Sequence, residues 1–466
     1  MYIEDLIKEV TGKDCIKFDD LTKKWLQWYK GNVDEFHIYE EYNGVNKVSC
    51  KRKSLNMAKK VCEDWANLLM NEKTDVVAKD TKEQEELWKL LNSVKFWVKG
   101  NVGVEKTFAL GAGAFVSSFD NKLKPRLQFV NKTKIYPITV DQDEIIECAF
   151  VNVNSRNVII QLHIKGNIIN EQYIPDDDGN YIVRTIVFEK QKETDDLGKL
   201  ISDESVDTGS NIKWFQIIQP NIANNVDLSS PLGISIFANA IDTLQGVDLA
   251  YDGFCEEMRI GKAKVFIDKK LTRYDEKGEK ILFDVNQTGF YYIGDGNQEK
   301  QPLTIYNPAL RTDGYFNGIN NALNLLSSKV GFGSNHYRFD NGGISTATQV
   351  ISENSDMFRA LKKHEILLQE AIIGVCKALM YINNNFTNNT YKFDLNGNLE
   401  VKFDDSIIED KEAQKMSDRQ DVNMNIMSKI QYRMKWYNED EETAKKEIEK
   451  IKEENATNFG NFFSEE

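Results

Sequence analysis

The residue types that most often carry chemistry in proteins do not fall at catalytic spacings in this chain. None of the four histidines has a partner at the spacing of a zinc site, and these residues are His37, His163, His336 and His364. Gly12-Lys13 is followed by Asp14, so it does not complete a phosphate-binding P-loop. Nothing selects two of the 73 acidic residues as a general acid and base. We therefore expect no enzymatic activity, no metal and no cofactor.

Three carboxylates follow one another along a single expected helix. Asp248, Asp252 and Glu256 are spaced at i, i+4 and i+8, which places them on one helical face. Like charges at this spacing cost the helix a little stability. One interpretation is a solvated helix face, and the other is an acidic wall that faces a polyanion. The sequence alone leaves both interpretations open.

A loop of polar and aromatic residues runs from Gly331 to Gly343, with glycines at both ends. Glycine accepts backbone conformations that are closed to other residues, which predicts that this loop can move. The residues of interest between the glycines are Ser334, Asn335, His336, Tyr337 and Arg338. An ordinary surface loop is the alternative to a binding loop.

Size and charge exclude several classes of protein. The chain has 466 residues, which allow roughly three domains. With 59 basic and 73 acidic residues, its formal net charge of −14 disfavours a cationic surface that grips nucleic acid tightly. Six scattered cysteines without a CxxC pair indicate a reducing cytoplasm. The most apolar stretch, 366–382, is interrupted by polar residues, so we expect no membrane span.

Hydrophobic periodicity predicts the helices that must position these residues. Apolar residues at spacings of three and four predict helices over 18–30, 54–72, 81–99, 313–330 and 346–385, and charged helices are expected within 409–454. Ser230 and Pro231 suit the start of another long helix, because serine caps a helix and proline fits its first turn. This helix is expected to end at Ile260, with Gly261 as a left-handed stop.

The remaining segments read as β structure. Short β-rich runs separated by Asn, Asp and Gly predict a sheet-rich region over 107–222. A small β-rich insertion over 262–308 is expected between two long helices, and a hairpin is expected around Asn396-Gly397. Together with the helices, this pattern predicts an α+β fold class.

The order of five segments is similar to that of a known family. These segments are WLQWYKG (25–31), SLNMAKKVCEDWANLLMNEK (54–73), SSPLGISIFANAIDTLQGVDLAYD (229–252), TATQVISENSDMFRALKKHE (346–365) and SIIEDKEAQ (406–414). Together they resemble the portal protein of long-tailed, double-stranded-DNA bacteriophages, of the type found in phages of Gram-positive hosts. Each segment alone is a packing or capping signal, so the specificity lies in the order and spacing.

The resemblance implies a ring of about twelve subunits at a capsid vertex, with a central channel for DNA entry during packaging and exit during ejection. By position it implies a wing over 1–229, stem helices over 230–260 and 313–330, a clip over 261–312, a tunnel loop over 331–345, a long wing helix over 346–385, a wing hairpin over 386–404 and a crown over 405–466.

The same resemblance implies site residues and partners. Ser334 to Arg338 would face DNA from the tunnel loop, and Asp248, Asp252 and Glu256 would line the channel wall. The implied partners are other copies of the chain, double-stranded DNA, the terminase large subunit, a head–tail connector or adaptor, and the major capsid and scaffolding proteins. The implied location is the virion, after assembly in the host cytoplasm. The alternatives are another virion structural protein and a metal-dependent DNA-processing enzyme.

Overall fold

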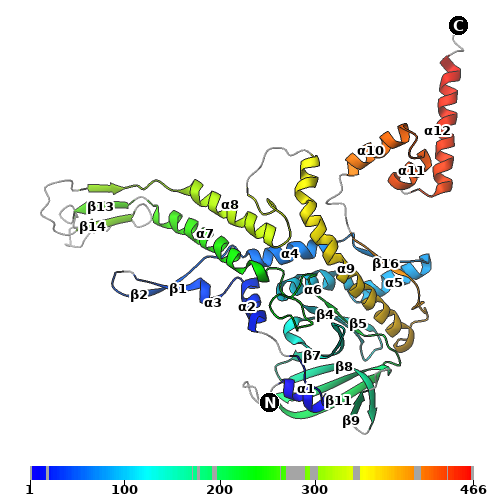
Figure 1. The fold of residues 1–466 in the computed structure, drawn as a ribbon, viewed down its shortest axis with the longest axis horizontal. Coiled ribbons are helices and arrows are strands. Elements are labelled where there is room, and N and C mark those ends of the chain that lie inside the picture. The colour runs from blue at the N-terminus through cyan, green and yellow to red at the C-terminus, as the bar shows by residue number, and fades with distance from the viewer. Residues whose placement is uncertain are drawn as a thin grey trace, which may run out of the picture. The chain divides into compact units, whose positions relative to one another are not determined.

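The computed structural model describes residues 3–16, 20–42, 44–169, 172–175, 179–190, 197–262, 264–268, 289–293, 303–339, 347–403, 411–437 and 439–462 (Figure 1). Its contacts divide the chain into two units. The first comprises Met1–Asp340 and Arg359–Phe403, and the second comprises Asn341–Phe358 and Asp404–Glu466. Helices and sheets both contribute to the first unit, which confirms the α+β class.

Helices open the first unit. They are α1 (Ile3–Thr11), α2 (Asp20–Tyr29), α3 (Asp34–His37), α4 (Met57–Leu69), α5 (Thr81–Ser93) and α6 (Phe96–Leu110). The helices predicted over 18–30 and 54–72 correspond to α2 and α4. On α4, Val61, Trp65 and Leu69 recur every four residues and form one fully buried face.

The single helix expected over 81–99 is wrong, because two helices occupy this segment. Lys95 adopts a left-handed conformation with φ of 57° between α5 and α6, which ends the helical hydrogen-bond pattern. Val94 and Phe96 on either side of it are buried. The bend therefore allows both apolar side chains to point into the core. In a straight helix, the two would point in different directions.

Two antiparallel sheets confirm the sheet-rich region over 107–222. Their strands are β4 (Gly113–Phe119), β5 (Pro125–Asn131), β6 (Ile135–Asp141), β7 (Glu144–Val153), β8 (Asn157–Ile169), β9 (Gln172–Pro175), β10 (Tyr181–Lys190), β11 (Leu197–Asp207) and β12 (Phe215–Ile218). One sheet has the order β11-β10-β8-β7-β6, with β9 paired to β8, and the other has the order β12-β4-β5. Alternate side chains of the larger sheet enter two cores, since Leu162 clusters with Leu6 of α1 whereas Phe150 clusters with Phe215 of β12.

Two buried histidines make this fold sensitive to acid. Burial lowers the pKa of His163 and of His364 from 6.5 to about 3, so the unfolded chain binds these protons first as the pH falls below 6.5. At pH 5 each histidine is expected to cost about 2 kcal/mol of stability relative to neutral pH. His163→Phe should therefore narrow the difference in unfolding free energy between pH 7 and pH 5 by about 2 kcal/mol. An unchanged difference in urea titrations at the two pH values would contradict this assignment.

Two further sheets have two strands each. β1 (Ile38–Tyr42) and β2 (Lys47–Lys51) form a hairpin, and β3 (Asp75–Ala78) pairs with β16 (Leu399–Lys402). The hairpin predicted around Asn396-Gly397 is therefore wrong, because the strand after this turn pairs with β3. The segment before the turn is bound elsewhere, since the Phe393 N–H donates to Asn384 Oδ1 (2.8 Å) and the Asp394 N–H donates to Glu83 Oε1 (3.1 Å).

A long helical excursion with a small sheet follows. Its elements are α7 (Ile241–Ile260), β13 (Lys264–Asp268), β14 (Gly289–Ile293), β15 (Leu303–Tyr306), α8 (Thr312–Lys329) and α9 (Ala347–Phe386). The three strands form one sheet in the order β14-β13-β15, as expected of the β-rich insertion. The helices predicted over 313–330 and 346–385 correspond to α8 and α9 within one residue. The strand-like run KILFDV (280–285) lies outside the described residues.

The helix expected to begin at Ser230 and Pro231 begins instead at Ile241. The segment before it is held by the sheet core, because Ile236 N–H donates to Phe108 O (2.9 Å) and Lys132 Nζ donates to Gly233 O (3.0 Å). These tertiary contacts override the local capping signal.

Helix α7 ends at Ile260 as expected, but the predicted reason for this end, a left-handed Gly261, is wrong. Gly261 has a φ of −70°, so it is not a left-handed stop. A Cβ on Gly261 would lie 2.1 Å from Leu310 Cδ2 and 2.7 Å from Glu257 O, so the need for glycine at this position is steric.

The second unit contains the charged helices expected within 409–454, namely α10 (Lys411–Asn423), α11 (Lys429–Tyr437) and α12 (Glu441–Phe462). Trp436 Nε1 donates to Asp418 Oδ2 (2.7 Å) and links α11 to α10, while Arg433 Nη2 lies 2.6 Å from Glu439 Oε1. In neither unit is a helix of the described residues long and apolar enough to cross a membrane.

Candidate functional site

The paired helices α7 and α8 form the framework of the candidate site. The chain runs out along α7, passes through β13 to β15 and returns along α8 beside it (Figure 1). Next to the small sheet, Arg311 Nη2 lies 2.7 Å from Glu257 Oε2, and the Arg311 N–H donates to Glu257 Oε1 (3.1 Å). A Cβ on Gly253 would lie 2.9 Å from the ring of Tyr315, so glycine allows α8 to approach closely. The two helices are thus clamped at the end that carries the sheet.

Two of the three carboxylates predicted to line a channel wall are buried. Asp248 and Asp252 are 3% and 7% exposed. Asp248 Oδ2 lies 3.0 Å from His37 Nε2, and its Oδ1 accepts the Leu55 N–H (2.8 Å). Asp252 Oδ1 accepts the Lys53 N–H (3.0 Å). The channel-wall prediction is therefore wrong for both residues, since these carboxylates are buried and accept hydrogen bonds from inside the subunit instead of facing a polyanion.

These buried carboxylates instead fix the segment after β2 onto α7. His37 Nδ1 accepts the Val33 N–H (2.8 Å), so its Nε2 carries the proton and donates to Asp248. The Arg52 N–H donates to His37 O (2.8 Å), and the Arg52 guanidinium lies 4.4 Å from the ring centroid of Tyr39. The base of the β1–β2 hairpin is consequently tied to α7 through a chain of hydrogen bonds.

Glu256, the third predicted wall residue, is half-buried and paired with a cation of its own helix. Its Oε2 lies 2.7 Å from Arg259 Nη2. The pair presents little net charge at the surface, so it is a weak source of repulsion for a polyanion.

The first part of the glycine-flanked loop is fastened to α4 by aromatic packing. Phe332 is 1% exposed, and its ring stacks between Trp65 (centroids 4.5 Å apart) and His336 (4.3 Å). Trp65 Nε1 also donates to Val330 O (3.1 Å). Gly331 makes the turn with φ of +91°, a conformation that favours glycine. The described start of the loop is therefore a packed structure.

Within this loop, the prediction that Tyr337 faces DNA is wrong. Tyr337 is 9% exposed, its hydroxyl donates to Asp64 Oδ2 (3.0 Å), and its N–H donates to Ser327 Oγ (3.2 Å). Burial raises the pKa of Tyr337, which keeps the hydroxyl protonated as a donor.

Four of the five predicted loop residues do lie at the surface, namely Ser334, Asn335, His336 and Arg338. Removal of water from part of its ring lowers the pKa of His336 below its ordinary value of 6.5, so this side chain is neutral at pH 7. Arg338 is exposed at the same surface and carries a positive charge. The rest of the predicted loop, 340–345, lies outside the described residues.

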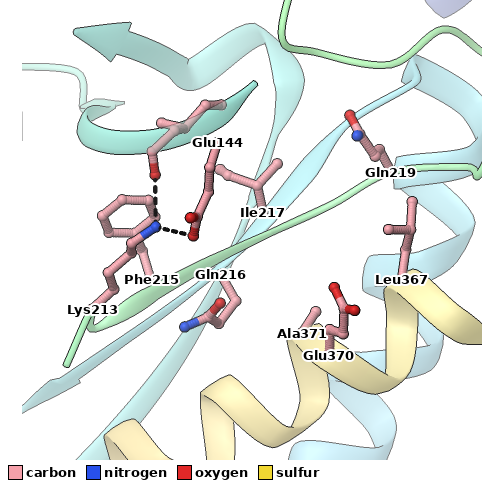
Figure 2. A pocket seen from close by; sticks show the side chains of 10 residues that line it. Glu144, Lys213, Phe215, Gln216, Ile217, Gln219, Leu367, Glu370 and Ala371 are labelled. Carbon is pink, nitrogen blue, oxygen red and sulfur yellow. Dashed lines mark hydrogen bonds and ion pairs between the residues drawn. The ribbon is translucent and has the colours of Figure 1, made fainter. Parts of the chain in front are cut away.

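A pocket of about 280 Å³ lies in the first unit beside β12 and α9 (Figure 2). Its lysine, Lys213, donates to Ile145 O (3.1 Å) and pairs with the Glu144 carboxylate. Gln216 and Gln219 add amide groups from the strand side, and Glu370 adds a carboxylate from α9. Since the lysine is already neutralised, the arrangement offers hydrogen bonding rather than an activated nucleophile or base.

Sequence reasoning missed the residues that hold this framework in place. His37 and Asp248 are 211 positions apart, and neither lies in a motif that points to the other. The same holds for Asp64, which binds the hydroxyl of Tyr337. In the part of the chain that the structure describes, no group of three or more His, Cys, Asp and Glu side chains is placed to hold a metal ion.

Comparison with known proteins gives a family match over most of the chain. The model of the family described as "Phage portal protein, SPP1 Gp6-like" matches residues 20–459. No curated protein matches the chain. Solved structures with similarity include a chain of the virion of a native gene transfer agent particle (TM-score 0.43, 7% identity, 92% of this chain and 96% of that chain). A chain from the neck of an empty gene transfer agent particle, computed with C6 symmetry, has a TM-score of 0.44 at 8% identity, covering 92% and 96%.

Proposed function

Because the chain belongs to the SPP1 Gp6-like family of phage portal proteins, it is a portal vertex protein of a virion, and we propose that about twelve copies form a closed ring around a DNA channel. Portal proteins are structural, and we propose that this chain likewise acts without catalysis. In the proposed ring, viral DNA enters during packaging and leaves during ejection through the same channel.

The clamped pair of α7 and α8 is the observation that carries this proposal. These helices expose large apolar side chains that a lone subunit leaves in water, namely Leu249, Met258, Ile260, Phe316 and Leu325. Contact between neighbouring copies around a ring would bury them, because a cyclic assembly repeats one heterologous interface. We assign α7 and α8 to the stem and the segment between them, 261–311, to the clip. The stem then begins at Ile241, because the segment before it belongs to the sheet core.

The other regions follow by position in the chain. The proposal places the tunnel loop at 331–345, the wing at 1–229 with the segments 346–385 and 386–404, and the crown at 405–466. The proposed partners of the ring are the terminase large subunit, a head–tail connector or adaptor, and the major capsid and scaffolding proteins. A different structural role in the virion is the remaining alternative, and ring formation distinguishes the two.

Arg338 provides a test of the tunnel loop. Arg338→Ala is expected to reduce DNA packaging about tenfold without changing ring assembly, since a hydrogen bond to a charged group contributes about 1.5–3 kcal/mol. The measurement is the amount of nuclease-protected DNA per particle, together with ring formation by electron microscopy. Lys329→Ala removes a nearby exposed charge at the end of α8 and serves as the matched control. Loss of ring assembly by Arg338→Ala would reassign the loop to a structural role.

A further inference from the structure

A basic hollow lies between the base of the β1–β2 hairpin and α7. It measures about 520 Å³, and its lining includes Lys30, Lys51, Arg52 and Lys53, with no acidic residue among the lining side chains. This composition is unusual in a chain whose acidic residues outnumber its basic ones by 73 to 59. The volume lies within the usual range of about 300–1,000 Å³ for ligand sites.

The lysines of this hollow keep their charge available. Within the part of the chain that the structure describes, no carboxylate pairs with the ammonium groups of Lys30, Lys51 or Lys53. Many other lysines of the chain are paired, as Lys47 is with Glu40 at 3.0 Å. Like charges gathered without a counter-ion repel one another, so the hollow gains stability when an anion enters it.

The backbone under these lysines is held in place by the fold. Asp252 Oδ1 accepts the Lys53 N–H, and Asp248 Oδ1 accepts the Leu55 N–H, so the two buried carboxylates fix the run after β2. Both carboxylates thus accept backbone hydrogen bonds from this run and do not pair with its lysine side chains. The ammonium groups of Lys51 and Lys53 are left for an outside ligand, with little reorganisation needed on binding.

The other walls add hydrogen-bond donors. Ser54 contributes a hydroxyl group, whose oxygen already accepts the Asn56 N–H (2.9 Å), which leaves the hydroxyl proton for a ligand. Tyr251, whose side chain is hydrogen-bonded to Cys255, forms the wall on the α7 side. Gly31 has φ of +67°, and a Cβ there would lie 2.8 Å from Asn56 Oδ1, so close packing shapes this wall. Ammonium and hydroxyl donors around one hollow match the acceptor oxygens of a phosphate group.

We propose that this hollow binds phosphate groups of the DNA backbone and gives the otherwise acidic subunit a local point of contact with DNA. The phosphate chemistry rests on the geometry of the hollow alone, whereas duplex DNA as its source rests on the proposed function. An overall charge of −14 makes extended binding unfavourable, so a small cationic site confines the attraction to one place.

The test compares two double variants of the whole chain. Lys51→Gln with Lys53→Gln removes two charges from the hollow, whereas Lys79→Gln with Lys122→Gln removes two exposed charges elsewhere. Fluorescence anisotropy with a labelled 20-base-pair duplex, over a series of salt concentrations, measures affinity and its salt dependence. The hollow variant should weaken binding about tenfold and reduce the slope of log K against log salt by about 2, whereas the control should change neither. Pyrophosphate should compete with the duplex for the unmodified protein.

Each other outcome overturns a stated part of the proposal. Equal losses in the two double variants would mean that duplex binding is not localised to the hollow. Binding of pyrophosphate but not of duplex would keep the phosphate site and exclude DNA as its source. Loss of ring assembly with duplex binding unchanged would make the hollow a contact between copies of the chain. Ring formation is measured separately by electron microscopy. If the hollow does not bind phosphate, the portal assignment still stands, and if no rings form, phosphate binding by the hollow can still be measured.

Discussion

Trp65→Ala is expected to destabilise the first unit by about 3–5 kcal/mol, the usual cost of removing a fully buried aromatic side chain. Trp65 is 0% exposed and stacks on Phe332, and its Nε1 holds the carbonyl of Val330 at the end of α8. The substitution therefore opens a cavity and also releases the start of the glycine-flanked loop. Urea unfolding measures the first effect, and the rate of tryptic cleavage after the exposed Arg338 measures the second.

Trp88 on α5 offers a matched control, because its side chain is 55% exposed. Trp88→Ala is expected to change the unfolding free energy by about 0.5 kcal/mol or less. Trp65→Phe should fall between the two, since it keeps an aromatic ring for the stack and loses a hydrogen bond that contributes about 1 kcal/mol. Equal effects of Trp65→Ala and Trp88→Ala would show that α4 does not anchor the loop.

Asp248→Ala is expected to lower the unfolding free energy by about 2–5 kcal/mol, because it leaves the buried His37 Nε2 and the partly buried Leu55 N–H without their acceptor. The loss should be concentrated at the base of the β1–β2 hairpin. Tryptic cleavage at Lys51 and Lys53 should accelerate more than the change in global stability explains. Thermal unfolding together with timed proteolysis provides both measurements.

The control for this substitution lies on the same helix. Asp242 is an exposed acid in the first turn of α7, so Asp242→Ala removes a charge of the same type at a cost of up to about 1 kcal/mol. An acidic wall facing a channel would give the opposite pattern. In that case Asp248→Ala would change neither the unfolding free energy nor the rate of proteolysis. That result would contradict a stabilising role of Asp248 inside the fold.

The sequence predicts the long elements of this fold well, where a periodic pattern and a glycine act together. α8 and α9 begin and end within one residue of expectation, because apolar residues recur at spacings of three and four over many turns. The order of the segments also identifies the family, which the match over residues 20–459 confirms. These features depend on local spacing, which a sequence records directly.

The remaining features depend on contacts between distant segments, which a single sequence does not reveal. Pro231 signals a helix start, but the contact of Ile236 with Phe108 holds that segment non-helical until Ile241. Asp248 has the spacing of a solvated acid, yet His37 provides a buried partner 211 positions away. A carboxylate on a helix face has the same spacing whether it faces water or the protein interior.

The run Lys51-Arg52-Lys53 illustrates the same limit. Its three consecutive cations are visible in the sequence, but an exposed and a pocketed basic run have the same composition. Only the fold brings Lys30 and Tyr251 to the same hollow. The phosphate ligand that we propose for this hollow is argued from its charge and donors.

The central claim is that copies of this chain form a hollow ring, and electron microscopy of the purified protein tests it most directly. We expect end-on views of closed rings with about twelve subunits and an open centre, with α7 and α8 of each copy packed against those of its neighbours. Rings should disappear when Leu249, exposed on α7, is replaced by glutamate. A compact closed particle without a central channel, under conditions in which the chain assembles, would contradict the portal assignment.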